Sequence, residues 1–140
     1  MNFDTRGLRV MVAEHDRAVL EMLQIRLDTA GFNTCTARDG LLALETLKTY
    51  RPSALLIDLR LPGLNGFEVL KLINPRGTRL PFQVLVMARD LGAEDIQQAL
   101  ALGAADCIAK PFSGADVLER LVRLLRRPLN TPRPKRPLYV

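Results

Sequence analysis

The sequence has few of the residues that build disulfide frameworks or zinc centres: two cysteines, Cys35 and Cys107, and one histidine, His15. Each cysteine stands inside a short run of strand-forming residues, and no metal-ligand spacing connects the cysteines with each other or with His15. We therefore expect two small buried thiols and neither a disulfide nor a structural metal.

Long apolar runs are also missing. No stretch approaches the roughly 18 consecutive apolar residues of a membrane-spanning helix, although 48% of the residues are hydrophobic. The first seven residues, Met1–Gly7, do not have the pattern of a signal peptide. A length of 140 residues suits a single hydrophobic core. We expect one compact cytoplasmic domain without a membrane segment.

Acidic residues are absent from positions 126–140, which hold five basic residues and four of the nine prolines. The other 125 residues carry 15 positive and 15 negative charges, so the net charge of +5 belongs to this segment. Such a composition favours an extended linker, or a weak polyanion contact. We predict a domain at 1–127 and a Pro/Arg-rich linker or tail at 128–140. The neutral body has no basic stripe with interleaved aromatic residues, so it is not predicted to bind nucleic acid.

Five short β-like runs alternate with five runs of helical periodicity. The predicted strands are 8–13, 32–37, 54–57, 82–88 and 105–109. Asp16 and Asp39 are predicted N-caps, Ser113 begins the last helix with a capping-box-like pair, and Gly31 and Gly103 are predicted stops. Right-handed crossovers then leave a flavodoxin-like, doubly wound (βα)5 fold with a parallel five-stranded sheet in the order 2-1-3-4-5.

Polar residues stand where the predicted strands end. Asp58 follows the buried run 54–57, and Glu14 and His15 follow the first strand. Strands one and three are neighbours in the predicted order, so these three residues are expected to share a cleft at the carboxyl edge of the sheet. Lys110, at the end of the fifth strand, faces the same cleft. For Asp58 alone, a helix cap or turn aspartate is the alternative, and for Lys110 a simple ion pair with Asp58.

Several motifs coincide at these strand ends. They are Glu14, Asp58 followed by Pro62 and Gly66, Ala88-Arg89-Asp90, Gly103-Ala104-Ala105-Asp106 and Lys110-Pro111-Phe112. Together they resemble the receiver domain of two-component response regulators, over residues 8–127. The resemblance implies that Asp58 accepts a phosphoryl group from a sensor histidine kinase, and that Lys110 pairs with a phosphoryl oxygen. It also implies a Mg²⁺ ion held by Glu14, Asp58 and the backbone carbonyl of Arg60.

The chain departs from the family's pattern at three positions. His15 stands where the family has its second acid, the direct metal ligand, and imidazole is a poor ligand for Mg²⁺. Met87 replaces a threonine or serine whose hydroxyl binds the phosphoryl group, and Cys107 replaces an aromatic ring that moves with that hydroxyl. Asp16 is the alternative for this acid, but it is displaced by one residue from the family's position and has a competing role as a helix cap. We predict a pseudo-receiver that signals through constitutive contacts or another input; a working phosphoacceptor is the alternative.

The C-terminal segment indicates the output. Residues 124–140 resemble the junction before the winged-helix DNA-binding domain of transcriptional response regulators. We expect a homodimer through the fourth helix, fifth strand and fifth helix, and control of transcription through a DNA-binding domain after residue 140. A single-domain regulator acting by protein–protein contact is the alternative. We do not expect an enzyme: an aspartate-nucleophile phosphatase is a remote alternative, because Arg60 stands where that class needs its general acid and no substrate-capping insertion is present.

Overall fold

A computed structural model describes residues 3–127 of the chain. Its strands are β1 (Arg9–Ala13), β2 (Asn33–Ala37), β3 (Ala54–Asp58), β4 (Gln83–Ala88) and β5 (Asp106–Ala109). Its helices are α1 (Arg17–Thr29), α2 (Gly40–Leu47), α3 (Gly66–Ile73), α4 (Ala93–Ala101) and α5 (Gly114–Arg126). The predicted linker at 128–140 lies outside the described residues, so that boundary stays a prediction.

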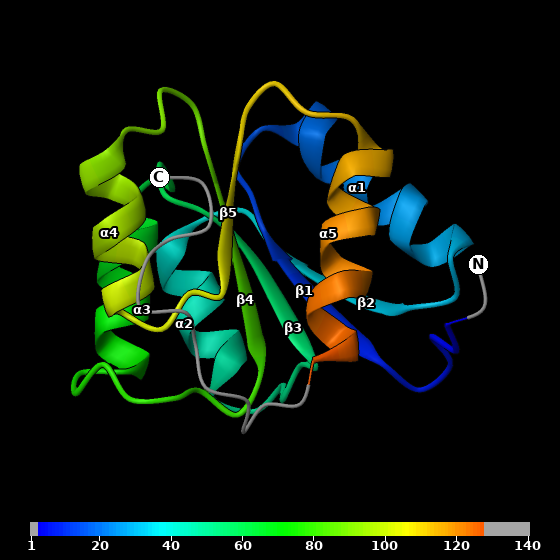
Figure 1. The fold of residues 1–140 in the computed structure, drawn as a ribbon, viewed down its shortest axis with the longest axis horizontal. Coiled ribbons are helices and arrows are strands. Elements are labelled where there is room, and N and C mark those ends of the chain that lie inside the picture. Colours follow the sequence, from blue (N-terminus) through cyan, green and yellow to red (C-terminus); the bar gives the residue numbers. More distant parts are fainter. Residues whose placement is uncertain (1–2, 128–140) are drawn as a thin grey trace.

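The five strands form one parallel sheet in the order β2-β1-β3-β4-β5. Helices α1 and α5 cover one face of the sheet, and α2, α3 and α4 cover the other (Figure 1). The predicted flavodoxin-like fold and its strand order are confirmed. The order reverses direction at β1 and β3, so the carboxyl ends of these two strands lie beside each other.

The core is divided into two layers by the sheet. Residues of β3 alternate between them: Leu55 and Ile57 pack with α2, α3 and α4, whereas Leu56 packs with α1 and α5. Every residue of β3 and β4 is buried, because these central strands have helices on both faces. A polar side chain at the end of β3 is therefore held in a rigid, largely dry setting.

The helix ends use the capping residues that the sequence predicts. The Asp16 side chain accepts hydrogen bonds from the first turn of α1, and Ser113 forms a capping box with Asp116 at the start of α5. Gly31 and Gly103 follow α1 and α4 with φ angles of +97° and +110°. These angles suit glycine, so both helices end where the sequence indicates.

The two cysteines are not disulfide-bonded and lie on the opposite edge strands, β2 and β5. Cys107 is buried as expected, but the expectation of a buried thiol is wrong for Cys35, which is half-buried. None of the helices within residues 3–127 combines the length and apolar character that crossing a membrane requires.

Candidate functional site

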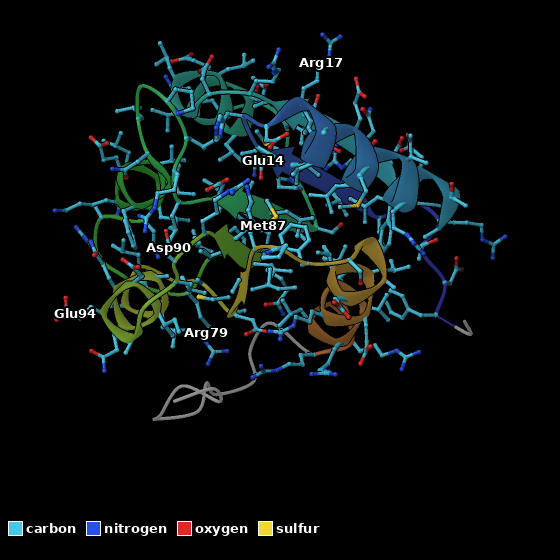
Figure 2. All side chains as sticks on the ribbon, turned by 90° about the horizontal axis from the view of Figure 1, so that it is seen from above. Glu14, Arg17, Arg79, Met87, Asp90 and Glu94 are labelled. Carbon is cyan, nitrogen blue, oxygen red and sulfur yellow. The ribbon has the colours of Figure 1, made fainter. Side chains whose placement is uncertain are left out.

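Three strand ends deliver Glu14, Asp58 and Lys110 to one rim of the sheet. Ala13 and Ile57 are paired in register, which places Glu14 and Asp58 side by side. Lys110 follows β5, which is separated from β3 by β4. Its side chain therefore reaches across the end of β4 to meet Asp58, a span that a long side chain can make. Figure 2 looks down on this rim, with Glu14 and Met87 near the middle of the molecule.

The Lys110 ammonium bridges the two acids. Its Nζ atom donates a hydrogen bond to Asp58 Oδ2 and lies 2.5 Å from Glu14 Oε1. The backbone N–H of Arg60 donates to Asp58 Oδ1 at 2.7 Å, and the N–H of Asp16 donates to Glu14 Oε2 at 3.0 Å. Glu14 and Asp58 are 0% and 1% exposed. Each of the four carboxylate oxygens thus faces a donor or a cation inside the protein.

The buried cluster shifts the pKa values of its members. Burial, with a smaller contribution from the negative charge of Asp58, raises the pKa of Glu14, and together they outweigh the lowering by Lys110 and by the N–H of Asp16. Burial alone would lower the pKa of Lys110, but the bonds to Asp58 and Glu14 raise it overall. Lys110 is therefore a fixed cation at neutral pH, and the cluster of two carboxylates and one ammonium is held together by charge.

The loop after β3 packs directly against the strand end. Gly66 is the first residue of α3, and its N–H donates to Leu59 O at 3.1 Å. A Cβ atom at this position would lie 2.6 Å from Asp58 O and 2.8 Å from Leu59 Cα. Glycine at position 66 therefore allows the loop to close tightly around the acid.

His15 lies at the edge of the rim rather than inside it. Its Nδ1 atom is 3.5 Å from Glu14 Oε2, and its side chain is 49% exposed. Asp16 does not take the place of the family's second acid. Its Oδ1 atom accepts from the N–H groups of Ala18 and Val19 at 3.0 and 3.3 Å, so it serves as the cap of α1.

Met87 and Cys107 also lie where the sequence pattern places them. Met87 is the register partner of Asp58 on β4 and is fully buried, so a thioether stands beside the acid. A thioether donates no hydrogen bond. Cys107 is 4% exposed on β5, within the core layer formed with α2, α3 and α4. Both positions are filled by packed side chains without the hydroxyl or the ring.

Two ion pairs around the site were not predicted. The Arg60 guanidinium lies 3.5 Å from Asp95 Oδ2 and so connects the loop after β3 to the start of α4. Arg120 of α5 pairs with Asp106 at 3.3 Å and donates to Cys107 O at 2.9 Å. The first contact joins the loop after β3 to α4, the second joins the consecutive elements β5 and α5, and neither has a local spacing or motif that could have revealed it.

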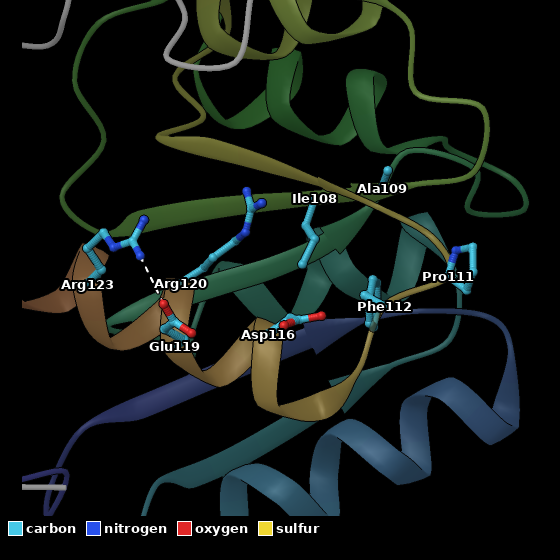
Figure 3. Close-up of a pocket in the computed structure, with 8 residues that line it drawn as sticks. All are labelled: Ile108, Ala109, Pro111, Phe112, Asp116, Glu119, Arg120 and Arg123. Atoms are coloured by element: carbon cyan, nitrogen blue, oxygen red, sulfur yellow. Dashed lines mark hydrogen bonds and ion pairs between the residues drawn. The ribbon is translucent and has the colours of Figure 1, made fainter.

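A hollow lies between β5 and α5 (Figure 3). It is lined by Ile108, Ala109, Pro111, Phe112, Asp116, Glu119, Arg120 and Arg123. Arg123 pairs with Glu119 at 3.1 Å across its rim. Ala109 and Pro111, which flank Lys110 in the chain, line the hollow. Glu14, Asp58 and Lys110 do not line it. It is a polar surface feature on the face opposite to α2 and α3.

The fold and the rim together define a doubly wound α/β domain with two buried acids and a lysine at its switch point. The chain belongs to the response regulator receiver domain family, whose model matches residues 10–122. The sequence prediction of this family is confirmed, and the matched family is one of signalling domains, not of known enzymes.

Known relatives and solved structures agree with this family. The chain is 40% identical over 121 residues to response regulator MprA of Mycobacterium ulcerans, a match that covers 86% of this chain and 51% of that protein. The receiver domain of Francisella response regulator 1452 superposes with a TM-score of 0.78 at 26% identity, covering 86% of this chain and 98% of that one. Full-length FixJ from B. japonicum superposes with a TM-score of 0.75 at 29% identity, covering 87% of this chain and 59% of that one.

The chain therefore spans about half the length of the curated relatives that it matches.

Receiver domains bind Mg²⁺ at acidic residues, and Glu14 and Asp58 form the acidic cluster of this chain. The third side chain with a ligand atom within 4.8 Å of theirs is His15, not an acid. Mg²⁺ requires near-ideal octahedral oxygen ligands. The donor set, with its imidazole and with a lysine already between the two acids, is a poor match for this ion.

Proposed function

We propose that the chain is the receiver part of a response regulator whose output does not depend on phosphorylation of Asp58. The observation that carries the proposal is the arrangement around this acid. Lys110 joins Asp58 to Glu14, and the register partner of Asp58 is the buried thioether of Met87. The acceptor Asp58 is kept. Of the side chains that would stabilise a phosphoryl group and respond to its presence, only Lys110 remains.

The chemistry of phosphoryl transfer supports this proposal. The transferring group carries charge on three equatorial oxygens, so catalysis depends on cations and hydrogen-bond donors in fixed positions. Removing one such donor from an enzyme site costs on the order of 10²–10³ in rate. Here Met87 offers no donor and His15 replaces a carboxylate, so transfer to Asp58 is expected to be several orders of magnitude slower than in a complete site.

A phosphoaccepting receiver is the second candidate. Its support is the preserved geometry of Glu14, Asp58 and Lys110 at one rim, with Asp58 oriented by the N–H of Arg60. Under this candidate a sensor histidine kinase is the donor and Mg²⁺ is held by Glu14, Asp58 and the backbone carbonyl of Arg60. The substitutions at His15, Met87 and Cys107 would then be neutral.

The experiment that separates the candidates is intact-mass measurement after incubation with Mg²⁺ and a small phosphodonor. We expect the mass of the wild-type chain to stay unchanged. A gain of one phosphoryl group, lost in Asp58→Asn, would refute the phosphorylation-independent function and leave the second candidate.

A double variant tests the cause. His15→Asp with Met87→Thr restores the missing acid and hydroxyl, so it is expected to acquire one phosphoryl group under the same conditions. The matched control adds Asp58→Asn to this variant and is expected to remain unlabelled. Absence of labelling in the double variant would show that these two residues are not what limits transfer.

We propose that the output lies in a DNA-binding domain after residue 140, in keeping with the half-length match to its relatives. The receiver would act in the cytoplasm as a homodimer through α4, β5 and α5, and the polar hollow of Figure 3 lies between two of these elements, β5 and α5. A single-domain regulator that acts by protein–protein contact is the alternative. Fusion of the chain to its genomic downstream segment, followed by a DNA-binding assay, distinguishes the two.

A further inference from the structure

Charge is distributed unevenly between the two edges of the sheet. Most of the acids end or follow a strand, or begin a helix, at the carboxyl edge: Glu14, Asp16, Asp39, Asp58, Glu68, Asp90, Glu94, Asp95 and Asp116. The opposite, amino edge is formed by strand starts and helix ends, and it carries arginines. Arg9 begins β1, Arg51 stands three residues before β3, and Arg126 and Arg127 end α5. The body is neutral as a whole, but the fold makes one edge basic.

Hydrogen bonds bring these arginines together around Ser53. The N–H of Ser53 donates to Arg9 O at 2.7 Å, and the N–H of Gln83 donates to Ser53 O at 3.1 Å. The side-chain amide of Gln83 donates to Leu124 O at 3.0 Å and to Arg127 O at 3.5 Å. The last turn of α5 is therefore held beside the starts of β3 and β4, and Figure 1 shows these segments together.

The four arginines carry charge that the described acids do not neutralise. All four are at least partly exposed, and none forms an ion pair with an acid of residues 3–127. The guanidinium carbon of Arg9 lies 5.2 Å from the centre of the Tyr50 ring, and that of Arg126 lies 5.5 Å from the centre of the Phe3 ring. These rings orient the guanidinium groups and leave their N–H groups available to an anion.

The other acids of this edge already have partners. Asp4 pairs with Arg6, Glu45 with Lys48 and Asp106 with Arg120, and Asp28 accepts a hydrogen bond from Thr34. The excess charge of the amino edge is therefore not cancelled by neighbouring carboxylates among residues 3–127.

We propose that Arg9, Arg51, Arg126 and Arg127, the amino-edge cluster, bind the phosphate backbone of double-stranded DNA. A guanidinium group forms bidentate hydrogen bonds with phosphate and is more weakly hydrated than an ammonium group. Residues 128–140 continue the chain from this end of α5 with three more basic residues and no acid. The choice of DNA rests on the proposed DNA-binding output, because that output follows the same end of α5 in the chain.

The cluster is less suited to a lipid surface or to a single strand. Within residues 3–127 the large apolar side chains that are exposed lie on α1, α2 and α3, outside the cluster: Ile25, Leu41, Leu42 and Leu72. The cluster therefore has no apolar anchor for insertion among lipids. Tyr50 and Phe3 each have an arginine over one face, which reduces the surface on which a base could stack. Contact with phosphates, without reading of bases, is what the cluster fits.

The test measures how salt weakens DNA binding by the chain of residues 1–140. A short fluorescent duplex of arbitrary sequence is titrated by anisotropy at about 50–200 mM salt, where each phosphate contact contributes about −0.9 to the slope of log K against log salt. Four contacts predict a slope of about −3.6 or steeper for the wild type. Arg9→Gln with Arg51→Gln should reduce its magnitude by about 1.8, and so should Arg126→Gln with Arg127→Gln. The two pairs lie on different elements, so each is informative if the other disturbs the fold.

Arg17→Gln with Arg38→Gln is the matched control. It removes the same charge from the opposite edge, where Arg17 begins α1 and Arg38 donates to His15 O at 3.4 Å. We expect the control to keep the slope of the wild type, and urea denaturation shows which variants are folded.

Three results would overturn the proposal. They are the absence of DNA binding at the lowest salt, a slope that neither cluster variant changes, and equal changes in the cluster variants and the control. Tighter binding to vesicles of phosphatidylserine and phosphatidylcholine than to the duplex would also overturn it, by assigning the cluster to a membrane. The measurements use neither a phosphodonor nor a downstream domain. Failure here is therefore distinguishable from failure of the phosphorylation-independent function or of the proposed output domain.

Discussion

Lys110→Met is the sharpest test of how the rim is held together. The substitution keeps a long apolar side chain but removes the only cation that bridges Glu14 and Asp58 among the described residues. Both acids are at most 1% exposed, so water cannot replace the ammonium without opening the core. Removing one partner of a buried ion pair typically costs about 3–5 kcal/mol.

We expect a loss of this size in the free energy of unfolding at neutral pH, measured by urea denaturation. A loss of this size lowers Tm by on the order of 10 °C in a domain near 150 residues. Lys48→Met is the matched control, because Lys48 pairs with Glu45 at 3.1 Å on the surface, with both side chains more than half exposed. Exposed pairs contribute roughly 0–1 kcal/mol. A Lys110→Met loss no larger than that of the control would refute the bridging role.

The pH dependence gives a second readout of the same variant. Lys110 lowers the pKa of Glu14, so its removal raises that pKa further above the ordinary value of 4.5. A carboxyl group whose pKa is higher in the folded protein than in the unfolded chain stabilises the fold at a pH below its ordinary pKa. This contribution is lost as the pH rises through the pKa of the folded state. The gap between wild type and variant should therefore be smallest in acid and grow toward neutral pH. It should shrink again above 10.5, where the wild type loses the stability that its own raised Lys110 pKa provides. A constant gap would contradict a charge-based role.

Two further substitutions test the packing around the site. Gly66→Ala would place a Cβ 2.6 Å from Asp58 O, so we expect the free energy of unfolding, measured by urea denaturation, to fall by about 1–3 kcal/mol. Gly92→Ala is the control and should be tolerated, because its Cβ would lie 3.9 Å from Asp95 Oδ2. Equal losses in the two variants would contradict the steric argument. Gln83→Leu removes the buried amide that donates to Leu124 O at 3.0 Å at the end of α5. Because Leu124 O also accepts from the N–H of Arg127 at 3.1 Å, the loss of this one hydrogen bond should cost about 0.5–1.5 kcal/mol. A variant as stable as wild type would show that the end of α5 is held by other contacts.

Much of the fold could be predicted because its signals are local. The alternation of short apolar runs with helical periodicity defined the elements, and residues such as Asp16 and Ser113 cap their helices through contacts within a few positions. The strand order then placed Glu14 and Asp58 together, since neighbouring parallel strands end at the same edge. The starts of several strands were predicted one residue too early, where hydrogen bonding to a neighbour, not residue type, decides the boundary.

The parts of the site that could not be predicted depend on distances between elements. Sequence spacing does not reveal that Arg60 pairs with Asp95 of α4, or that Arg120 of α5 pairs with Asp106 of β5. The sequence left open whether Asp16 could act as an acid of the site. In the folded chain the Asp16 carboxylate lies over the first turn of α1 and accepts hydrogen bonds from backbone N–H groups there.

The sequence by itself determined which residues stand at the strand ends, and hence the family and the identity of each group at the rim. Only the tertiary structure decided how those groups share charge. One ammonium crosses the end of β4 to serve two buried carboxylates, while His15 stays at the solvent edge. The physical reason is that residue type and periodicity act along the chain, whereas burial and electrostatic pairing are set by atoms that folding brings together.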